Sequence, residues 1–243
     1  MGAAFGWGLL AASSLVIGDV AALVIRIDRK VIGLIMGFGA GVLISAISFD
    51  LVVEAVDKGP HKWAPLLGIL AGSLAFFGGD LLISRYGGAD RKDPGGAQEE
   101  GSPLAIVLGT VLDGIPESLV IGLTIVEGGA VGTAYLAAVF ISNLPEAISS
   151  TAGLVTSGWR KSRILWMWIA IALVSGISSL LGYSLFQDAS PDTVAFILTF
   201  AAGGILAMLA ETMMPEAFEQ GHKLVGIATT LGFVVAFGIH QLD

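Results

Sequence analysis

Two short motifs place oxygen-bearing side chains at helical spacing inside apolar stretches of the chain. The first runs from Asp113 to Glu117 and the second from Ser142 to Glu146, and both follow the pattern polar-x-x-Pro-Glu. Residues four apart share one face of a helix, so each motif directs its polar side chains the same way. Carboxylate and amide oxygens bind divalent cations. The spacing therefore puts Asp113 and Glu117 on one helix face and Ser142 and Glu146 on another, with Asn143 close by, and a divalent cation is one partner that such oxygens could share.

The composition sets the environment of these motifs. The chain has 243 residues, of which 55% are hydrophobic and 13% charged, and it has no Cys. Its mean hydropathy is +0.86. Soluble domains carry about 25% charged residues, so a soluble enzyme is excluded, as are a disordered chain, a disulfide scaffold and a thiolate metal site. The net charge of -8 argues against a nucleic-acid partner.

The apolar stretches predict an all-α polytopic membrane protein. About 20 apolar residues are enough for one crossing, and we expect a single domain over residues 1–243 with eight transmembrane helices. Their predicted ranges are 4–25, 31–56, 64–84, 103–126, 130–156, 164–186, 192–218 and 223–240.

The loop charges predict the orientation of the chain. Only Lys58 and Lys62, among 12 Lys and Arg residues, follow an even-numbered span. Because basic residues favour the cytoplasmic side, both termini are expected outside. The longest connection, residues 85–102, is then a cytoplasmic loop, and its turn-rich, charged sequence predicts a flexible segment.

An internal repeat relates the second and seventh predicted spans. Residues 38–55 and 200–217 match at a constant offset, with Phe38 aligned to Phe200 and Glu54 to Glu216. Two spans of opposite direction that share a sequence indicate an inverted repeat, which is common in secondary transporters.

Acidic residues at membrane depth need a partner, because each costs about 2.5–3.5 kcal/mol at the centre of a helix. Within the predicted spans the only Lys or Arg is Lys223, the first residue of the last one, so no basic residue lies at the depth of the acids. Asp113, Glu117 and Glu146 must then be protonated, hydrated or bound to a cation, and neutral acids hydrogen-bonded between helices are the alternative. Asp50 and Glu211 extend the acids toward the two span ends, which predicts an acidic trail for the metal from outside to inside; helix-end acids in contact with interfacial water are the alternative.

The two Pro-Glu motifs resemble those of the ZIP family of divalent-metal transporters. The resemblance implies that Asp113, Glu117, Ser142, Asn143 and Glu146 hold the metal, and that the metal is a substrate. Zinc is the ion that the family favours, with manganese and iron as alternatives. The family's usual histidines are Asp113 and Ser142 here, and the 85–102 loop has no His. Manganese and magnesium prefer oxygen ligands to the imidazole nitrogen of His. The identity of the metal therefore stays open.

The resulting hypothesis is a non-enzymatic transporter in a plasma or inner membrane that moves metal toward the cytoplasm. The lipid bilayer and the metal are its expected partners, no nucleic acid is expected, and a homodimer is left open. A metal-binding protein without transport is one alternative. An intramembrane hydrolase is another, since Phe77 to Asp80 superficially suggests an aspartyl-protease motif, but a clear partner Asp is missing. No P-loop for a nucleotide-driven pump is present.

Overall fold

The computed structural model describes residues 1–59, 61–86, 91–92, 94, 103–128 and 132–242. Within these ranges the chain is helical apart from short turns, and it contains no strand. The helices of four or more residues are α1 (Gly2–Val24), α2 (Arg29–Ala46), η1 (Ile47–Val53), α3 (Glu54–Lys58), α4 (Trp63–Ser84), α5 (Pro103–Gly128), α6 (Thr133–Thr156), α7 (Lys161–Leu185), α8 (Pro191–Met208), η3 (Leu209–Met213), α9 (Met214–Gly221) and α10 (Val225–His240).

Each range predicted to span the membrane is helical over nearly all of its described residues, so the prediction of an all-α protein is confirmed. Six helical stretches of the described chain are long and apolar enough to cross a membrane, and the last of them, Pro191–His240, includes both α8 and α10. The α6 helix is not among them. It packs against α1 and α2 and buries several hydroxyl and amide side chains. A helix surrounded by protein does not need a uniformly apolar surface. The number of crossings stays a prediction.

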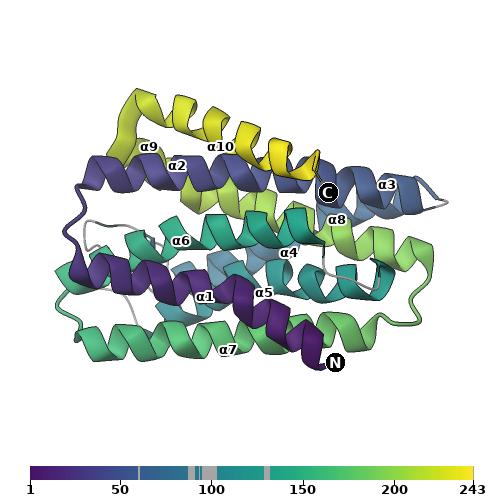
Figure 1. Cartoon of the computed structure of the whole chain (residues 1–243), viewed down its shortest axis with the longest axis horizontal. Helices are drawn as coiled ribbons and strands as arrows, with labels where there is room; N and C mark the ends of the chain where they lie inside the picture. Colours follow the sequence, from purple (N-terminus) through teal and green to yellow (C-terminus); the bar gives the residue numbers. More distant parts are fainter. Residues whose placement is uncertain (60, 87–90, 93, 95–102, 129–131, 243) are drawn as a thin grey trace.

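The long helices lie roughly along one direction and form two groups (Figure 1). In the first group α1 packs on α6 and α7, and α5 packs on α7. In the second group α4 packs on α8 and α10 packs on α2, while η1 joins α2 to α8. The main contact between the groups is that of α2 with α6, and α5 also contacts α4 and α8. We call these the α1/α5/α6/α7 group and the α2/α4/α8/α10 group.

The repeated segments share an unusual local structure. Both helices that contain them widen into a π-helix, η1 in the first and η3 in the second. The π-helices begin at Ile47 and Leu209, which are separated by the same offset as Phe38 and Phe200. The α2 and α8 helices run in opposite directions (Figure 1). This agreement supports the internal repeat, and π-helical turns are frequent at functional sites.

Two glycines at equivalent positions of the repeat allow close helix packing. A Cβ atom at Gly41 of α2 would collide with the Thr229 carbonyl of α10, and one at Gly203 of α8 would collide with the Ile69 carbonyl of α4. Small residues of this kind let membrane helices approach until their backbones touch. Each repeat therefore brings its own partner helix into contact.

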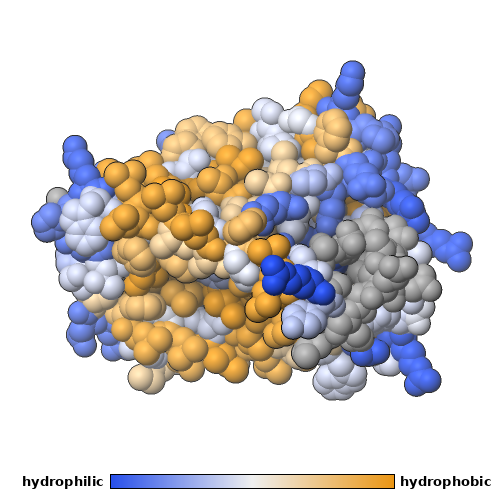
Figure 2. Space-filling model, turned by 180° about the vertical axis from the view of Figure 1, so that it is seen from behind, coloured by the Kyte–Doolittle hydropathy of each residue, from blue (hydrophilic) through white to orange (hydrophobic). Residues whose placement is uncertain are grey.

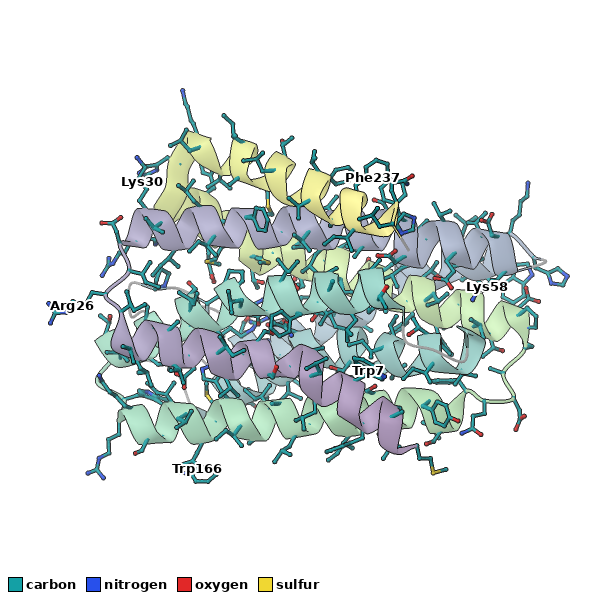
Figure 3. The ribbon with its side chains drawn as sticks, in the orientation of Figure 1. Trp7, Arg26, Lys30, Lys58, Trp166 and Phe237 are labelled. Atoms are coloured by element: carbon teal, nitrogen blue, oxygen red, sulfur yellow. The ribbon has the colours of Figure 1, made fainter. Side chains whose placement is uncertain are left out.

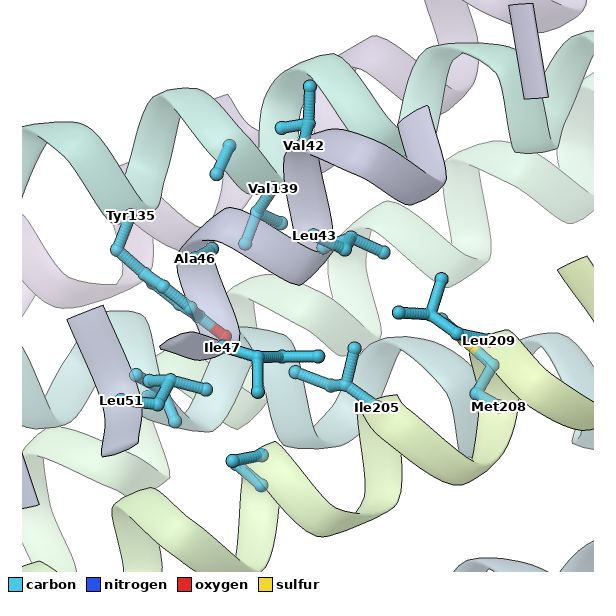
Figure 4. Close-up of a cluster of buried hydrophobic side chains, with 14 of the residues drawn as sticks. Val42, Leu43, Ala46, Ile47, Leu51, Tyr135, Val139, Ile205, Met208 and Leu209 are labelled. Carbon is cyan, nitrogen blue, oxygen red and sulfur yellow. The ribbon is translucent and has the colours of Figure 1, made fainter. Parts of the chain in front are cut away.

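The main apolar core lies where the two groups meet. Figure 4 shows Val42 and Leu43 of α2 and Ile47 of η1 beside α6. The α6 side chains there are Tyr135 and Val139, and Ile205 of α8 and Leu209 of η3 lie nearby. These side chains belong to one buried cluster. The core therefore fixes α6 against the helix that carries η1.

Charged residues lie at the two ends of the molecule. Figure 3 shows Arg26 and Lys30 at one end and Lys58 at the other, and both termini lie toward the Lys58 end (Figure 1). Hydrophobic residues cover the middle of the face shown in Figure 2, and hydrophilic residues gather toward its ends. This distribution suits a protein that crosses a bilayer.

Candidate metal site

The α5 and α6 helices carry the predicted metal ligands into the interior. Asp113 and Glu117 on α5 are 3% and 2% exposed, and Glu146 on α6 is 6% exposed. Pro116 and Pro145 lie inside these helices. A proline in a helix leaves the carbonyl one turn earlier without its amide partner. Carboxylates and freed carbonyls are therefore concentrated along the same stretch of two adjacent elements.

The acids do have basic partners, so the prediction that they lack them was wrong. Arg91 and Lys92, from the 85–102 connection, are both fully buried. The Arg91 guanidinium holds the Asp113 carboxylate at two points, with Nε 3.0 Å from Oδ2 and Nη2 2.9 Å from Oδ1. Its Nη1 also lies 2.8 Å from Oδ1 of Asp80 on α4. One guanidinium thus joins a helix of each group.

Lys92 places its ammonium between the two motifs. The Nζ atom lies 3.2 Å from Oδ2 of Asp113 and 3.5 Å from Oε1 of Glu146. The Ser149 hydroxyl of α6 donates a hydrogen bond to the Lys92 carbonyl and fixes the backbone there. Burial alone would lower the pKa of Lys92, but Asp113 and Glu146 raise the pKa above its ordinary value. The two carboxylates therefore favour the charged form of the Lys92 ammonium.

Glu117 completes the acidic centre. Its strongest electrostatic neighbours are Glu146, Lys92 and Asp113. Tyr135 of α6 interacts in turn with Glu117 and with Asp50. Neighbouring carboxylates repel each other unless a cation lies among them. The centre is thus an oxygen-rich site that requires positive charge.

The other two predicted ligands in α6 are buried beside this centre. Ser142 and Asn143 are 2% and 7% exposed. The Ser142 hydroxyl donates a hydrogen bond of 3.0 Å to the Val139 carbonyl of its own helix. Its oxygen lone pairs remain available as acceptors while this bond is made.

The two outlying acids lie in the two π-helices, on opposite sides of the centre. Asp50 of η1 pairs with His240 at the end of α10, with Nδ1 2.6 Å from Oδ1. Glu211 of η3 is exposed and interacts with Asp80 and Arg91. Asp50 acts electrostatically on Tyr135, and Arg91 acts on Glu211. That these acids form a route for a metal stays a prediction.

The described residues contain no group of three or more Asp, Glu, His or Cys side chains arranged to hold a metal ion. The geometry gives a physical reason, because Arg91 and Lys92 hold the oxygens of Asp113 and Glu146. The carboxylates are arranged around two tethered cations. A metal would need those same oxygens.

Sequence reasoning missed Arg91 and Lys92 because the segment around them, rich in Gly, Asp and Pro, is typical of a solvated loop. Most of residues 85–102 lie outside the described residues, so the flexibility prediction stays open, but these two side chains are buried. One signal could have found them. Asp113, the first acid of the two motifs, lacks a basic partner within its own predicted span and follows the adjacent Arg91 and Lys92 pair by only 21 residues. The His240 pairing with Asp50 was also missed, since the sequence places His240 at a helix end.

Comparison with known proteins adds an independent line of support. The putative zinc transporter At3g08650 of Arabidopsis thaliana is 27% identical over 221 residues, 90% of this chain and 35% of the relative. The zinc transporter zipt-7.2 of Caenorhabditis elegans is 31% identical over 111 residues, 43% of this chain and 23% of the relative. The chain thus spans about a third and about a quarter of the lengths of these two relatives. No protein-family model matches the chain. The two relatives confirm the resemblance of this chain to the ZIP family of transporters.

Proposed function

We propose that this chain moves a divalent metal cation, zinc in the first instance, across a cell membrane toward the cytoplasm. The metal binds to Asp113, Glu117 and Glu146, with Ser142 and Asn143 supplying further oxygens. The observation that carries the proposal is the burial of three carboxylates on two proline-containing helices of an apolar helical protein. Relatives named as zinc transporters support the same substrate.

The acids outside the centre provide a route. Asp50 lies near the end of the molecule that bears Lys58 and the termini, which the charge distribution predicts to be outside. Glu211 lies in the oppositely directed repeat, and Arg91 connects it to the centre. A cation would pass from Asp50 to the Glu117–Glu146 pair and leave past Glu211. Alternating exposure of the centre would come from movement of α5 and α6 against the α2/α4/α8/α10 group.

The pairing of Asp80 argues against the hydrolase alternative. An aspartyl dyad needs two carboxylates that share a proton. Asp80 and Asp113 instead contact different nitrogen atoms of the Arg91 guanidinium, so each carboxylate is paired with a cation and not with the other acid. The remaining alternative is a protein that binds metal without moving it, and only a flux measurement separates that from transport.

Metal entry into proteoliposomes tests the proposal. Purified protein would be reconstituted around a fluorescent zinc indicator, and zinc, manganese and iron(II) would be added outside at equal free concentrations. Zinc should enter faster than into protein-free vesicles. Glu117→Gln should slow entry by at least about tenfold, because weaker perturbations of metal sites already cost 10–100-fold. Glu219→Gln, which alters an exposed acid of α9, is the matched control. Equilibrium binding without entry would contradict transport.

A further inference from the structure

The buried Arg91–Lys92 pair has a role that metal transport by itself does not require. We propose that Arg91 and Lys92 form a cationic clasp, which occupies the metal centre and locks the two helix groups together until an incoming metal displaces it. This inference rests on the proposed function and adds a regulatory device to the same site. Three features carry it: the position of the two cations, the bridge that Arg91 makes, and the cost of leaving buried charges unpaired.

The position of the two cations makes them competitors of a metal. The Lys92 ammonium contacts carboxylate oxygens of both motifs, 3.2 Å away in Asp113 and 3.5 Å away in Glu146. Arg91 occupies both oxygens of Asp113. A dication placed on the same oxygens would be a few ångströms from two positive charges, and their repulsion is strong where water is excluded. Metal and clasp therefore bind alternately.

The bridge made by Arg91 crosses the boundary between the helix groups. Asp80 belongs to α4 of the α2/α4/α8/α10 group, and Asp113 belongs to α5 of the α1/α5/α6/α7 group. The same boundary is incompletely packed beside Pro116, where α4, α5 and α8 line a pocket of about 160 Å³. Lys92 is attracted in addition by Glu216 of α9. Movement of one group against the other must break this bridge.

The energetics make release of the clasp depend on the metal. Removing one member of a buried ion pair leaves the other charge uncompensated, which is strongly unfavourable. Arg91 and Lys92 therefore cannot leave Asp113 and Glu146 until another cation replaces them. A metal that takes the carboxylates frees the clasp, and the groups can then move. The closed state is self-inhibited without metal, and movement without cargo is suppressed.

Metal affinity tests the competition. Zinc binding to the purified full chain would be measured by titration calorimetry for the parent, Lys92→Gln and Arg91→Gln. Because zinc must displace the clasp in order to bind, removing the clasp should raise the apparent affinity by at least about tenfold. Arg85→Gln, which removes an exposed charge from the same connection, should leave the affinity unchanged. Unchanged affinity in both clasp variants would overturn the competition, whereas failure of the parent and all variants to bind zinc would overturn the proposed function itself.

A distance measurement tests the lock. The chain has no Cys, so spin labels can be attached at Trp166→Cys on α7 and Leu231→Cys on α10, two exposed positions in different groups. Zinc should shift the distance distribution of the parent, and Asp80→Asn should produce that shift without zinc. Asp80→Asn leaves both cations on Asp113 and Glu146, so it tests the bridge even if Arg91→Gln fails to fold. A pair within one group, Leu10→Cys with Trp166→Cys, should not change. An Asp80→Asn distribution identical to that of the parent would overturn the lock.

Discussion

The Arg91 guanidinium and the Asp113 carboxylate form a two-point contact, with N···O distances of 3.0 and 2.9 Å between residues 22 positions apart. Both side chains are buried, at 0% and 3% exposure. A planar guanidinium matches a carboxylate in this way, whereas an ammonium cannot make two parallel bonds. The contact holds Arg91, which lies between α4 and α5 in the chain, against the middle of α5. In this state of the centre a cation of the protein occupies both oxygens of Asp113.

The first prediction concerns the stability of this contact. Arg91→Met should destabilise the protein by about 3–5 kcal/mol, because it removes the guanidinium from Asp80 and leaves Asp113 with Lys92 as its remaining cation among the described residues. Adding Asp113→Asn to Arg91→Met should recover part of the loss, since both charges are then gone. Denaturant unfolding in detergent micelles measures both variants against Arg85→Met. A double variant less stable than Arg91→Met alone would show that the ion pair is not what Arg91 contributes.

The second prediction concerns the choice of metal. Ser142→His adds one imidazole to an all-oxygen site and leaves Arg91 and Asp113 untouched. Because imidazole suits zinc better than manganese, the ratio of zinc to manganese uptake should rise in competition assays at equal free concentrations. Ser142→Asn, which keeps an oxygen ligand, should not change the ratio. An equal ratio in both variants would mean that residue 142 does not contact the metal.

The third prediction concerns helix packing in the repeat. Gly203→Ala should destabilise the protein by about 1–3 kcal/mol, since its methyl group would press against the α4 backbone. Gly78→Ala, on α4 itself, meets nothing within 4 Å. It should be neutral or stabilising by about 0.5–1 kcal/mol, because Ala favours a helix. Thermal unfolding of the two variants makes the comparison, and equal effects would contradict the role of Gly203 in close packing.

The helices could be predicted from the sequence because membrane helices are long and their composition is distinctive. The α4 helix, Trp63–Ser84, was predicted as 64–84, and α7, Lys161–Leu185, as 164–186. The α6 helix was predicted from its apolar character although it is less apolar than most of the others. Periodicity alone could not show that η1 and η3 are π-helices, since one extra residue per turn leaves no clear trace in composition.

Of the residues at the metal centre, only the acids and their neighbours in the two motifs could be predicted from the sequence. Asp113, Glu117 and Glu146 are conspicuous because a carboxylate in an apolar stretch is costly. Arg91 and Lys92 look like ordinary loop charges, and their burial goes with the contacts that these two residues make with α5 and α6. Tertiary placement of a turn is a long-range effect, which local sequence patterns do not encode. The sequence therefore identified the negative half of the centre and missed the positive half.

The fourth prediction concerns the direction of the acidic trail. A Cys at Asp50 should react with an impermeant thiol reagent from the outside only, and a Cys at Glu211 from the cytoplasmic side only. Zinc should slow both reactions, because both positions lie on the route. The native chain contributes no background, since it has no Cys. Labelling of both positions from the same side would contradict the orientation, and labelling that zinc does not affect would remove these acids from the route.

The location of zinc in the protein tests the central claim most directly. Crystals of the full chain grown with zinc would be measured at the zinc absorption edge, so that anomalous scattering identifies the ion. We predict one strong peak between α5 and α6, about 2.0–2.2 Å from carboxylate oxygens of Glu117 and Glu146, with the Lys92 ammonium withdrawn. A zinc peak only at the exposed histidines His61 and His222, with Lys92 still bound to Asp113 and Glu146, would contradict the proposed site.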